Sequence, residues 1–243
     1  SKGFQRRLEI LKTLVDFKDK KILDLGCGEG VWLREFAKLT GDQNVFGSDI
    51  DSESIQKALD QNPEFKKENL KVSTAEDLQF ESNMFDIVFQ NEVLEHVVDD
   101  IKTIRECFRV LKPGGKIILF TPNSGWPFET HGMFLGKKYY WGNIPLLPWM
   151  PKSIYKKFAP HVRNYSNKDL YKVIDSASRF SEEDGQNYEY SISYHKHVFP
   201  GFDGMVIRFG VVGRVIRAAI LSLEKTPLHF FVISHLMIIE KLK

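Results

Sequence analysis

Cysteine is scarce in this sequence, and no long apolar run is free of charge. Only two cysteines occur among the 243 residues, Cys27 and Cys107, and their spacing matches neither a disulfide framework nor a metal site. We therefore expect a reducing, cytoplasmic environment and no bound metal. The longest apolar stretch, residues 205–223, contains three arginines, which are costly inside a bilayer. A transmembrane span is therefore not predicted.

The chain also lacks a large charge of either sign and a targeting pattern. A formal net charge of +2 at pH 7 argues neither for nor against nucleic-acid binding, and no nucleic-acid partner is expected. Neither end has the pattern of a secretory signal peptide, and residues 1–14 have that of an amphipathic helix. The length suits one α/β domain with an elaboration, so we expect residues 1–243 to form a single domain.

Strand and helix patterns alternate over the first half of the chain. Apolar runs predict strands at residues 21–25, 44–49, 70–74, 85–90 and 115–121. Before the last of these, apolar residues recur at helical spacing, namely Ile101, Ile104, Phe108 and Leu111. Pro113 is expected to end this helix, and residues 114–115 to turn the chain. The alternation favours a mostly parallel sheet with helices on both faces.

The pattern changes after residue 123. Residues 124–164 contain three of the four tryptophans, several prolines and no clear periodicity, and we interpret them as an inserted segment. Helical spacing returns after Tyr165, with Ser166 as a candidate cap. A strand is expected at 188–194, a helix at 205–224 and a final strand near 230–240.

The most informative feature is the run of glycines after the first predicted strand. Residues 22–25 lead into Gly26, Gly28 and Gly30 at alternate positions. Without Cβ atoms, such a turn lets a ligand lie directly on the backbone. The second predicted strand ends in Asp49, where a carboxylate can accept both hydroxyls of a ribose. These residues predict a site for a nucleoside cofactor.

The glycine spacing distinguishes between cofactors. The dinucleotide fingerprint is G-x-G-x-x-G, but here Val31 occupies the place of the third glycine. Asp24 also lies where a pyrophosphate would approach, and a carboxylate there suits a cationic group such as an amine or a sulfonium. Cys27, within the loop, is expected to pack beneath it rather than to react.

These residues resemble a known family. DLGCGEG, at residues 24–30, resembles the first motif of the class I S-adenosylmethionine-dependent methyltransferases. The resemblance continues in order through GSDID, AEDLQF, FDIVFQNEVLEHV and VLKPGGKIILFTPN, so that five motifs lie in register over residues 20–123. EVLEHV and LKPGG are most similar to the small-molecule O-methyltransferase branch, which includes ubiquinone-type enzymes.

The resemblance implies a fold and a cofactor. The expected fold is a Rossmann-like, doubly wound α/β sheet of seven strands, mostly parallel with the last strand antiparallel. Helices would cover both faces, and residues 124–164 would form an inserted lid. The implied cofactor is S-adenosyl-L-methionine, with S-adenosyl-L-homocysteine as its product.

The resemblance also implies cofactor contacts. Asp24, or a water that it holds, would receive the methionyl amino group, and the glycine backbone would line the methionine and ribose. Asp49 would accept the ribose hydroxyls, and Ile50 would pack on one adenine face. Many members place an aspartate where this chain has Thr74. Backbone groups at Ala75 and Glu76, or the Glu76 side chain, must therefore accept the hydrogen bond from the adenine amine. The predicted set is Asp24, Gly26, Cys27, Gly28, Gly30, Asp49, Ile50, Ala75, Glu76, Asp77, Gln90, Asn91 and Glu92.

Two histidines are candidate catalytic bases. His96 follows the fourth predicted strand, beside the expected methyl group, and a structural role at the sheet edge is the alternative. His131 follows the fifth predicted strand, and a histidine pKa near neutrality suits removal of a proton from a hydroxyl. Alternatively, His131 and Glu129 simply tether the inserted segment.

The inserted segment bears on the acceptor. Its aromatic residues and lysines, against a lone acid, Glu129, suit a small or lipophilic acceptor that is methylated on a hydroxyl by in-line displacement. Transfer to nitrogen or carbon remains an alternative. Within the segment, residues 126–160 are interpreted as a substrate lid, a peripheral membrane contact or a homodimer interface, and the sequence leaves these three open.

Two other functional classes are less consistent with the sequence. An NAD-dependent oxidoreductase is disfavoured by Val31 and by the lack of a recognisable hydride-transfer site. A non-catalytic protein that binds S-adenosylmethionine is less consistent with an intact glycine loop followed by Asp49.

Overall fold

A computed structural model describes most of the chain. It covers residues 2–179, 181–182, 184–199, 210–211, 214–215, 218–219, 221–222, 224 and 226–243. The chain divides into two compact units. The insert unit comprises residues 1–16, 121–167 and 196–236, and the sheet unit comprises residues 17–120, 168–195 and 237–243. The expectation of a single domain with residues 124–164 as its lid stays a prediction.

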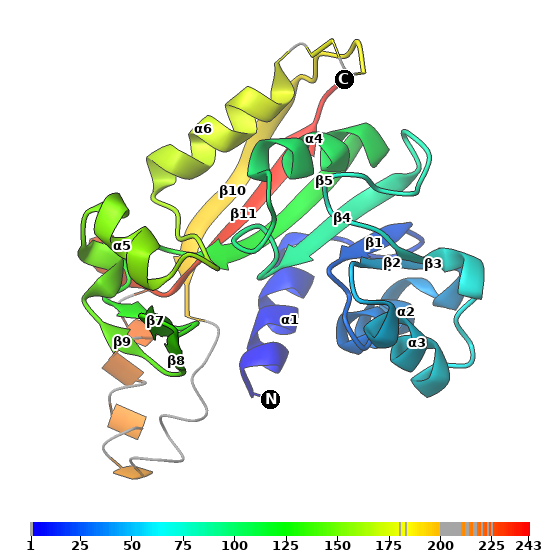
Figure 1. The fold of residues 1–243 in the computed structure, drawn as a ribbon. Helices are drawn as coiled ribbons and strands as arrows, with labels where there is room; N and C mark the ends of the chain where they lie inside the picture. Colours follow the sequence, from blue (N-terminus) through cyan, green and yellow to red (C-terminus); the bar gives the residue numbers. More distant parts are fainter. Residues whose placement is uncertain are drawn as a thin grey trace. The chain divides into compact units, whose positions relative to one another are not determined.

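A seven-stranded sheet forms the framework (Figure 1), and its strands lie in the order β10-β11-β5-β4-β1-β2-β3. The neighbours among β1 to β5 run parallel. The last strand is antiparallel, which confirms the predicted fold class. The strands are β1 Ile22–Leu25, β2 Val45–Asp49, β3 Leu70–Val72, β4 Phe85–Asn91, β5 Leu111–Pro122, β10 Tyr190–Val198 and β11 Ser234–Lys241.

Helices cover the sheet on both sides, with α4 and α6 on one side and α2 and α3 on the other (Figure 1). Asp51 begins α3 by accepting a hydrogen bond from the N–H of Glu53, and Asp99 begins α4 in the same way through Lys102. The helices are α1 Lys2–Leu14, α2 Val31–Thr40, α3 Ser52–Gln61, α4 Asp100–Val110 and α6 Asn167–Ser178, with short 3₁₀ helices at Asp42–Asn44 and Lys67–Asn69.

Several boundaries differ from the sequence prediction. Helix α4 ends at Val110, and Leu111, which was expected in the helix, is the first residue of β5. Ile101, which was expected on the buried face of the helix, is 40% exposed. The register shifts between Phe85, which faces Leu111, and Ile87, which faces Lys116; this irregularity accommodates the Pro-Gly-Gly turn within the strand.

The observed bounds of the C-terminal elements also differ from the predicted ones. β10 begins two residues later and ends four residues later than expected. β11 begins at Ser234 because residues Pro227–Phe231 form a 3₁₀ helix, η4, which Pro227 starts. The expected helix at 205–224 lies largely outside the described residues. Within the described part of the chain, no helix is long and apolar enough to cross a membrane.

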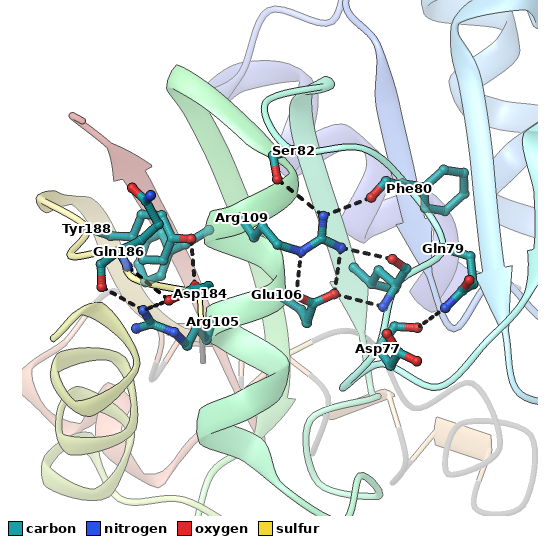
Figure 2. Close-up of polar contacts among 12 residues, drawn as sticks. Asp77, Gln79, Phe80, Ser82, Arg105, Glu106, Arg109, Asp184, Gln186 and Tyr188 are labelled. Carbon is teal, nitrogen blue, oxygen red and sulfur yellow. Dashed lines mark hydrogen bonds and ion pairs between the residues drawn. The ribbon is translucent and has the colours of Figure 1, made fainter. Parts of the chain in front are cut away.

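Two arginines of α4 join distant parts of the sheet unit (Figure 2). Arg105 donates to the carbonyls of Ala177 and Arg179, at 2.8 and 2.6 Å, and therefore caps the C-terminus of α6. Arg109 makes a two-pronged ion pair with Glu106, with N–O distances of 2.6 and 2.7 Å. It also donates to the carbonyls of Phe80 and Leu78, in the loop that precedes β4.

The inserted segment folds into short, paired elements of the insert unit. β6 Phe128–Glu129 pairs with β9 Ile144–Pro145, and β7 Met133–Leu135 pairs with β8 Lys138–Tyr140, both antiparallel. A 3₁₀ helix, η3 Leu147–Trp149, and a short helix, α5 Lys152–Phe158, follow. Their shared core consists of Leu147, Tyr155, Ala159 and Val162, with Met133, Ile144 and Phe158 packed against it.

Candidate functional site

The loop between β1 and α2 turns on three glycines with positive φ. Gly26, Gly28 and Gly30 have φ values of 74°, 50° and 81°, which side chains with a Cβ rarely adopt. The N–H of Gly26 donates to the carbonyl of Ser48 at 2.7 Å, which fastens the loop to β2. A Cβ on Gly26 would lie 2.4 Å from a methyl carbon of Val93. The loop therefore requires glycine for both conformation and space.

Cys27 lies beneath this loop. Its side chain is buried, and a Cβ on Gly47 would lie 2.8 Å from its Sγ. Burial, followed by the charges of Asp24 and Asp49, raises the pKa of the Cys27 thiol. A thiol that stays protonated is a poor nucleophile, so its burial and raised pKa are consistent with the packing role expected from the sequence.

Asp24 is a buried carboxyl in the central strand. Only 1% of it is exposed, and its Oδ2 has no hydrogen-bond partner among the described residues. Burial, and then the charge of Asp49, raises the pKa of Asp24 well above its ordinary value. A cation placed beside Oδ2 would supply the missing partner and lower this pKa. The residue therefore fits the cationic end of a ligand.

Asp49 is held by the loop that it faces. Its Oδ2 accepts a hydrogen bond from the N–H of Gly28 at 2.8 Å, and its Oδ1 accepts one from the N–H of Asp51 at 2.9 Å. Each carboxylate oxygen can accept a second hydrogen bond. The side chain is therefore fixed in place and keeps acceptor capacity for a diol.

A cavity of about 360 Å³ opens at the carboxyl ends of the parallel strands, which is a size that suits a small-molecule ligand. It brings together these predicted residues: Gly26, Asp49, Ile50, Ala75, Glu76, Glu92 and His96. Ile50 is 73% exposed, so an apolar face is available to a flat ring.

The other predicted cofactor residues do not line this cavity: Asp24, Cys27, Gly28, Gly30, Asp77, Gln90 and Asn91. A Cβ on Gly28 would meet no atom within 4 Å, so its backbone is open to a ligand. Gln90 is buried and donates from Nε2 to Sγ of Cys107 at 2.8 Å, while its Oε1 has no partner among the described residues. Asp77 is exposed, its N–H donates to the carbonyl of Thr74, and its carbonyl accepts from the side chain of Gln79.

Two acids shape the cavity wall. Oε1 of Glu76 accepts hydrogen bonds from the N–H groups of Val98 and Asp99, at 2.7 and 3.1 Å, and so joins the loop after β3 to the segment before α4. Glu92 has a φ of 59°, which is uncommon without glycine, and its N–H donates to the carbonyl of Phe120 at 3.0 Å. Non-glycine residues in this conformation concentrate at functional sites.

Sequence reasoning missed part of the wall, namely Leu25, Ser48, Ser73, Val93, Val97 and Val98. The valines come after β4 in a segment without helical or strand spacing, and Val98 is 88% exposed. An apolar run with no periodicity directly after a strand of a parallel sheet was the signal that could have found them. The two serines lie on neighbouring strands, with their Oγ atoms 2.7 Å apart.

A second polar cluster lies in the insert unit. Oε1 of Glu129 is 3.0 Å from the ring Nδ1 of His131. The same oxygen accepts a hydrogen bond from the backbone N–H of His131 at 2.8 Å. Oε2 accepts the hydroxyl of Tyr155 at 2.5 Å. Burial alone would raise the pKa of Glu129, but the hydrogen bonds from His131 and Tyr155 outweigh it and hold this pKa below its ordinary value. A ring that donates from Nδ1 presents Nε2 as its basic nitrogen.

Comparison with known proteins agrees with this arrangement. Residues 23–119 match a family described as a methyltransferase domain. The chain is 33% identical to a ubiquinone biosynthesis O-methyltransferase of Bartonella tribocorum over 171 residues, which are 67% of this chain and 64% of that protein. It is 35% identical to phosphoethanolamine N-methyltransferase 2 of Caenorhabditis elegans over 127 residues, which are 51% of this chain and 29% of that protein. The chain therefore spans less than two thirds of the length of these relatives.

The fold has solved counterparts. An S-adenosylmethionine-dependent methyltransferase from Mesorhizobium loti matches with a TM-score of 0.64 and 14% identity, over 98% of this chain and 97% of that one. At such low identity the likeness concerns the fold alone.

Proposed function

Because the chain belongs to the class I S-adenosylmethionine-dependent methyltransferases, we propose that it transfers the methyl group of S-adenosylmethionine to a small or lipophilic acceptor, at a hydroxyl oxygen. The observation that carries the proposal is the buried Asp24, beside the glycine loop, whose Oδ2 has no partner among the residues that the structure describes. A dinucleotide would bring a pyrophosphate toward this carboxyl, whereas S-adenosylmethionine brings an amino group.

The residues that line the cavity, together with Asp24 and Gly28 beside it, fit this cofactor. Asp24 would hold the methionyl amino group, directly or through a water, and the open backbone of Gly28 would line the ribose. Asp49 would accept from the ribose hydroxyls with the acceptor capacity that Gly28 and Asp51 leave. Ile50 would pack on the adenine, and backbone groups at Ala75 would read its amine, since Glu76 already accepts from two backbone N–H groups.

When bound, the cofactor supplies a methyl carbon that is already electrophilic because it is attached to a sulfonium. The protein then has to hold the acceptor in line, exclude water and, for a hydroxyl, accept a proton. His96 is one candidate base, because it is part of the cavity wall. His131 is the other, because Glu129 fixes the orientation of its ring.

Oxygen is proposed as the acceptor atom because of the ubiquinone biosynthesis O-methyltransferases among the relatives. The Caenorhabditis elegans relative, named for N-methylation of phosphoethanolamine, supports nitrogen as the alternative. Carbon methylation and cofactor binding without transfer complete the set of alternatives. Transfer of labelled methyl to hydroxylated aromatics, to primary amines and to a lipid extract, measured side by side, separates these outcomes.

Replacement of the candidate bases tests their roles. We expect His96→Ala or His131→Ala to lower turnover of a hydroxyl acceptor by about 10²- to 10⁴-fold, the range for loss of a general base. Affinity for S-adenosylhomocysteine, measured by calorimetry, should stay nearly unchanged. His195→Ala is a matched control, because His195 hydrogen-bonds Tyr171 outside the cavity wall. Normal turnover in both variants would exclude histidine as the base.

A further inference from the structure

The surface of the inserted segment carries charge of one sign. Its lone acid, Glu129, is only 3% exposed and is engaged by His131 and Tyr155. The segment exposes these lysines, for which the described residues supply no acidic partner: Lys137, Lys138, Lys156 and Lys157. Its exposed charge is therefore entirely positive, although the whole chain is nearly neutral, with a formal net charge of +2.

The same segment exposes large aromatic side chains. Trp141 is 77% exposed and Trp149 is 51% exposed. In contrast, Trp126 of the same segment is 7% exposed and packs with Phe199, so the fold can bury a tryptophan here. The exposed aromatic and aliphatic side chains are Leu135, Tyr139, Tyr140, Trp141, Leu146, Trp149, Met150 and Ile154. We call these residues, with the four lysines, the aromatic–lysine surface.

A packed base supports this surface. Met133 of β7 packs against the core that Tyr155 of α5 helps to form, and β7 and α5 lie together (Figure 1). Phe134 and Tyr139, paired across the β7–β8 hairpin, have ring centroids 5.0 Å apart. On α5, Tyr155 is buried while its neighbour Ile154 is 40% exposed. Leu135, Tyr139, Tyr140 and Ile154 therefore belong to anchored elements, while Trp141 directly follows β8.

The composition of this surface favours a lipid bilayer over other partners. Trp and Tyr are enriched at the headgroup level of membranes, and lysines nearby are attracted to anionic lipids. Lys138 already lies along an aromatic face, with its Nζ 5.2 Å from the ring centroid of Tyr140. A nucleic acid would stack on the rings but would leave Leu135, Met150 and Ile154 in water. A second copy of the chain would bring like charges together.

We propose that the aromatic–lysine surface docks on a membrane that contains anionic lipids, without crossing it. The aromatic and aliphatic side chains enter the headgroup region, and the lysines contact the lipid phosphates or carboxylates. This inference does not depend on methyl transfer, because it concerns binding of the protein without cofactor or acceptor.

Sedimentation with lipid vesicles tests the proposal. The protein should bind vesicles of phosphatidylcholine mixed with phosphatidylglycerol, bind phosphatidylcholine alone far more weakly, and lose affinity as salt rises. Each of Lys137→Gln and Lys138→Gln should lower the partition coefficient about fivefold. Trp141→Ala should lower it at high salt as well, because its contribution is apolar.

Matched variants outside the surface serve as controls. Lys67→Gln and Leu242→Ala replace exposed residues of the sheet unit and should leave vesicle binding unchanged. Equal binding to both vesicle types, or equal effects of the control variants, would overturn the proposal. So would a single-stranded oligonucleotide that displaces the protein from vesicles at equal concentration, or a dimer in solution that Trp141→Ala dissociates.

Discussion

Two polar clusters of the sheet unit differ in how completely the chain satisfies them. Around Arg109, all five N–H donors have an acceptor: two in Glu106, two in the carbonyls of Leu78 and Phe80, and one in the hydroxyl of Ser82 (Figure 2). At the carboxyl ends of the strands, buried acceptor atoms lack a partner among the described residues, namely Oδ2 of Asp24, Oε1 of Gln90 and Oδ1 of Asn91.

The difference shows which polar cluster is suited to a ligand. A cavity of about 300 Å³ also lies beside Arg109, lined in part by Lys241 and Tyr188. The ammonium of Lys241, however, donates to Asn83 and to the carbonyls of Phe108 and Leu111, so its donors are already used. Since unpaired buried polar groups are costly, a protein keeps them mainly where something else completes them. By this criterion the strand ends are suited to a ligand, whereas the Arg109 cluster stabilises the fold.

The largest expected effect comes from breaking the satisfied cluster. Arg109→Met removes the guanidinium, so that Oε1 of Glu106 and the carbonyls of Leu78 and Phe80 lose its hydrogen bonds, while Oε2 of Glu106 still accepts the N–H of Leu78. Because one member of a largely buried pair is lost, we expect the free energy of unfolding to fall by about 2–4 kcal/mol. Chemical denaturation measures this change.

The same variant should bind S-adenosylhomocysteine with unchanged affinity once it is folded. Lys112→Met is a control, because Lys112 pairs with Asp86 at a more exposed position and should cost less than about 1 kcal/mol. A large loss of cofactor affinity in Arg109→Met would contradict the separation of the two clusters.

A smaller effect is expected at Asp49, in the unsatisfied cluster. Asp49→Ala removes the acceptor of Gly28 N–H and the proposed acceptor of the ribose hydroxyls. We expect cofactor affinity to weaken by about 1–3 kcal/mol, the cost of an unpaired hydrogen-bonding group. Calorimetry with S-adenosylhomocysteine measures it. Unchanged affinity would remove Asp49 from the site, and Asp51→Ala, which removes only the helix cap, should lower stability and not affinity.

Part of the fold and of the candidate site was predictable from the sequence, because the alternation of strands and helices and the glycine loop follow from local patterns. Glycines at alternate positions after an apolar strand, and Asp49 at the end of the next, have short-range signals. The seven-stranded sheet, by contrast, was implied by the family resemblance and not by local patterns.

The arginine network was not predictable, because its contacts join residues far apart in the chain. Arg105 meets the end of α6 more than seventy residues later, and Arg109 meets a loop about thirty residues earlier. The boundary of β5 was also missed, because a strand can absorb a Pro-Gly-Gly turn only when its neighbour provides a register shift. Such pairings depend on tertiary structure, which local spacing does not encode.

The subtlest effect is expected at Asp24, where stability and binding should change in opposite directions. Burial and Asp49 raise the pKa of Asp24 in the folded protein above its unfolded value. Stability is therefore greatest below the unfolded pKa and falls as pH rises through the folded pKa. Asp24→Asn removes the ionisation, so the free protein should gain about 1–2 kcal/mol of stability at alkaline pH and nothing at acidic pH.

The affinity for a cationic ligand should change with pH in the direction opposite to the change in stability. A cationic ligand favours the ionised carboxyl, so the affinity of the unmodified protein should rise with pH through the folded pKa of Asp24. The Asp24→Asn variant should bind more weakly and show a flatter pH profile, measured by calorimetry over the same range as the denaturation curves. A variant that becomes more stable and also binds more tightly would mean that Asp24 opposes the ligand, and the cluster would then not be a cation site.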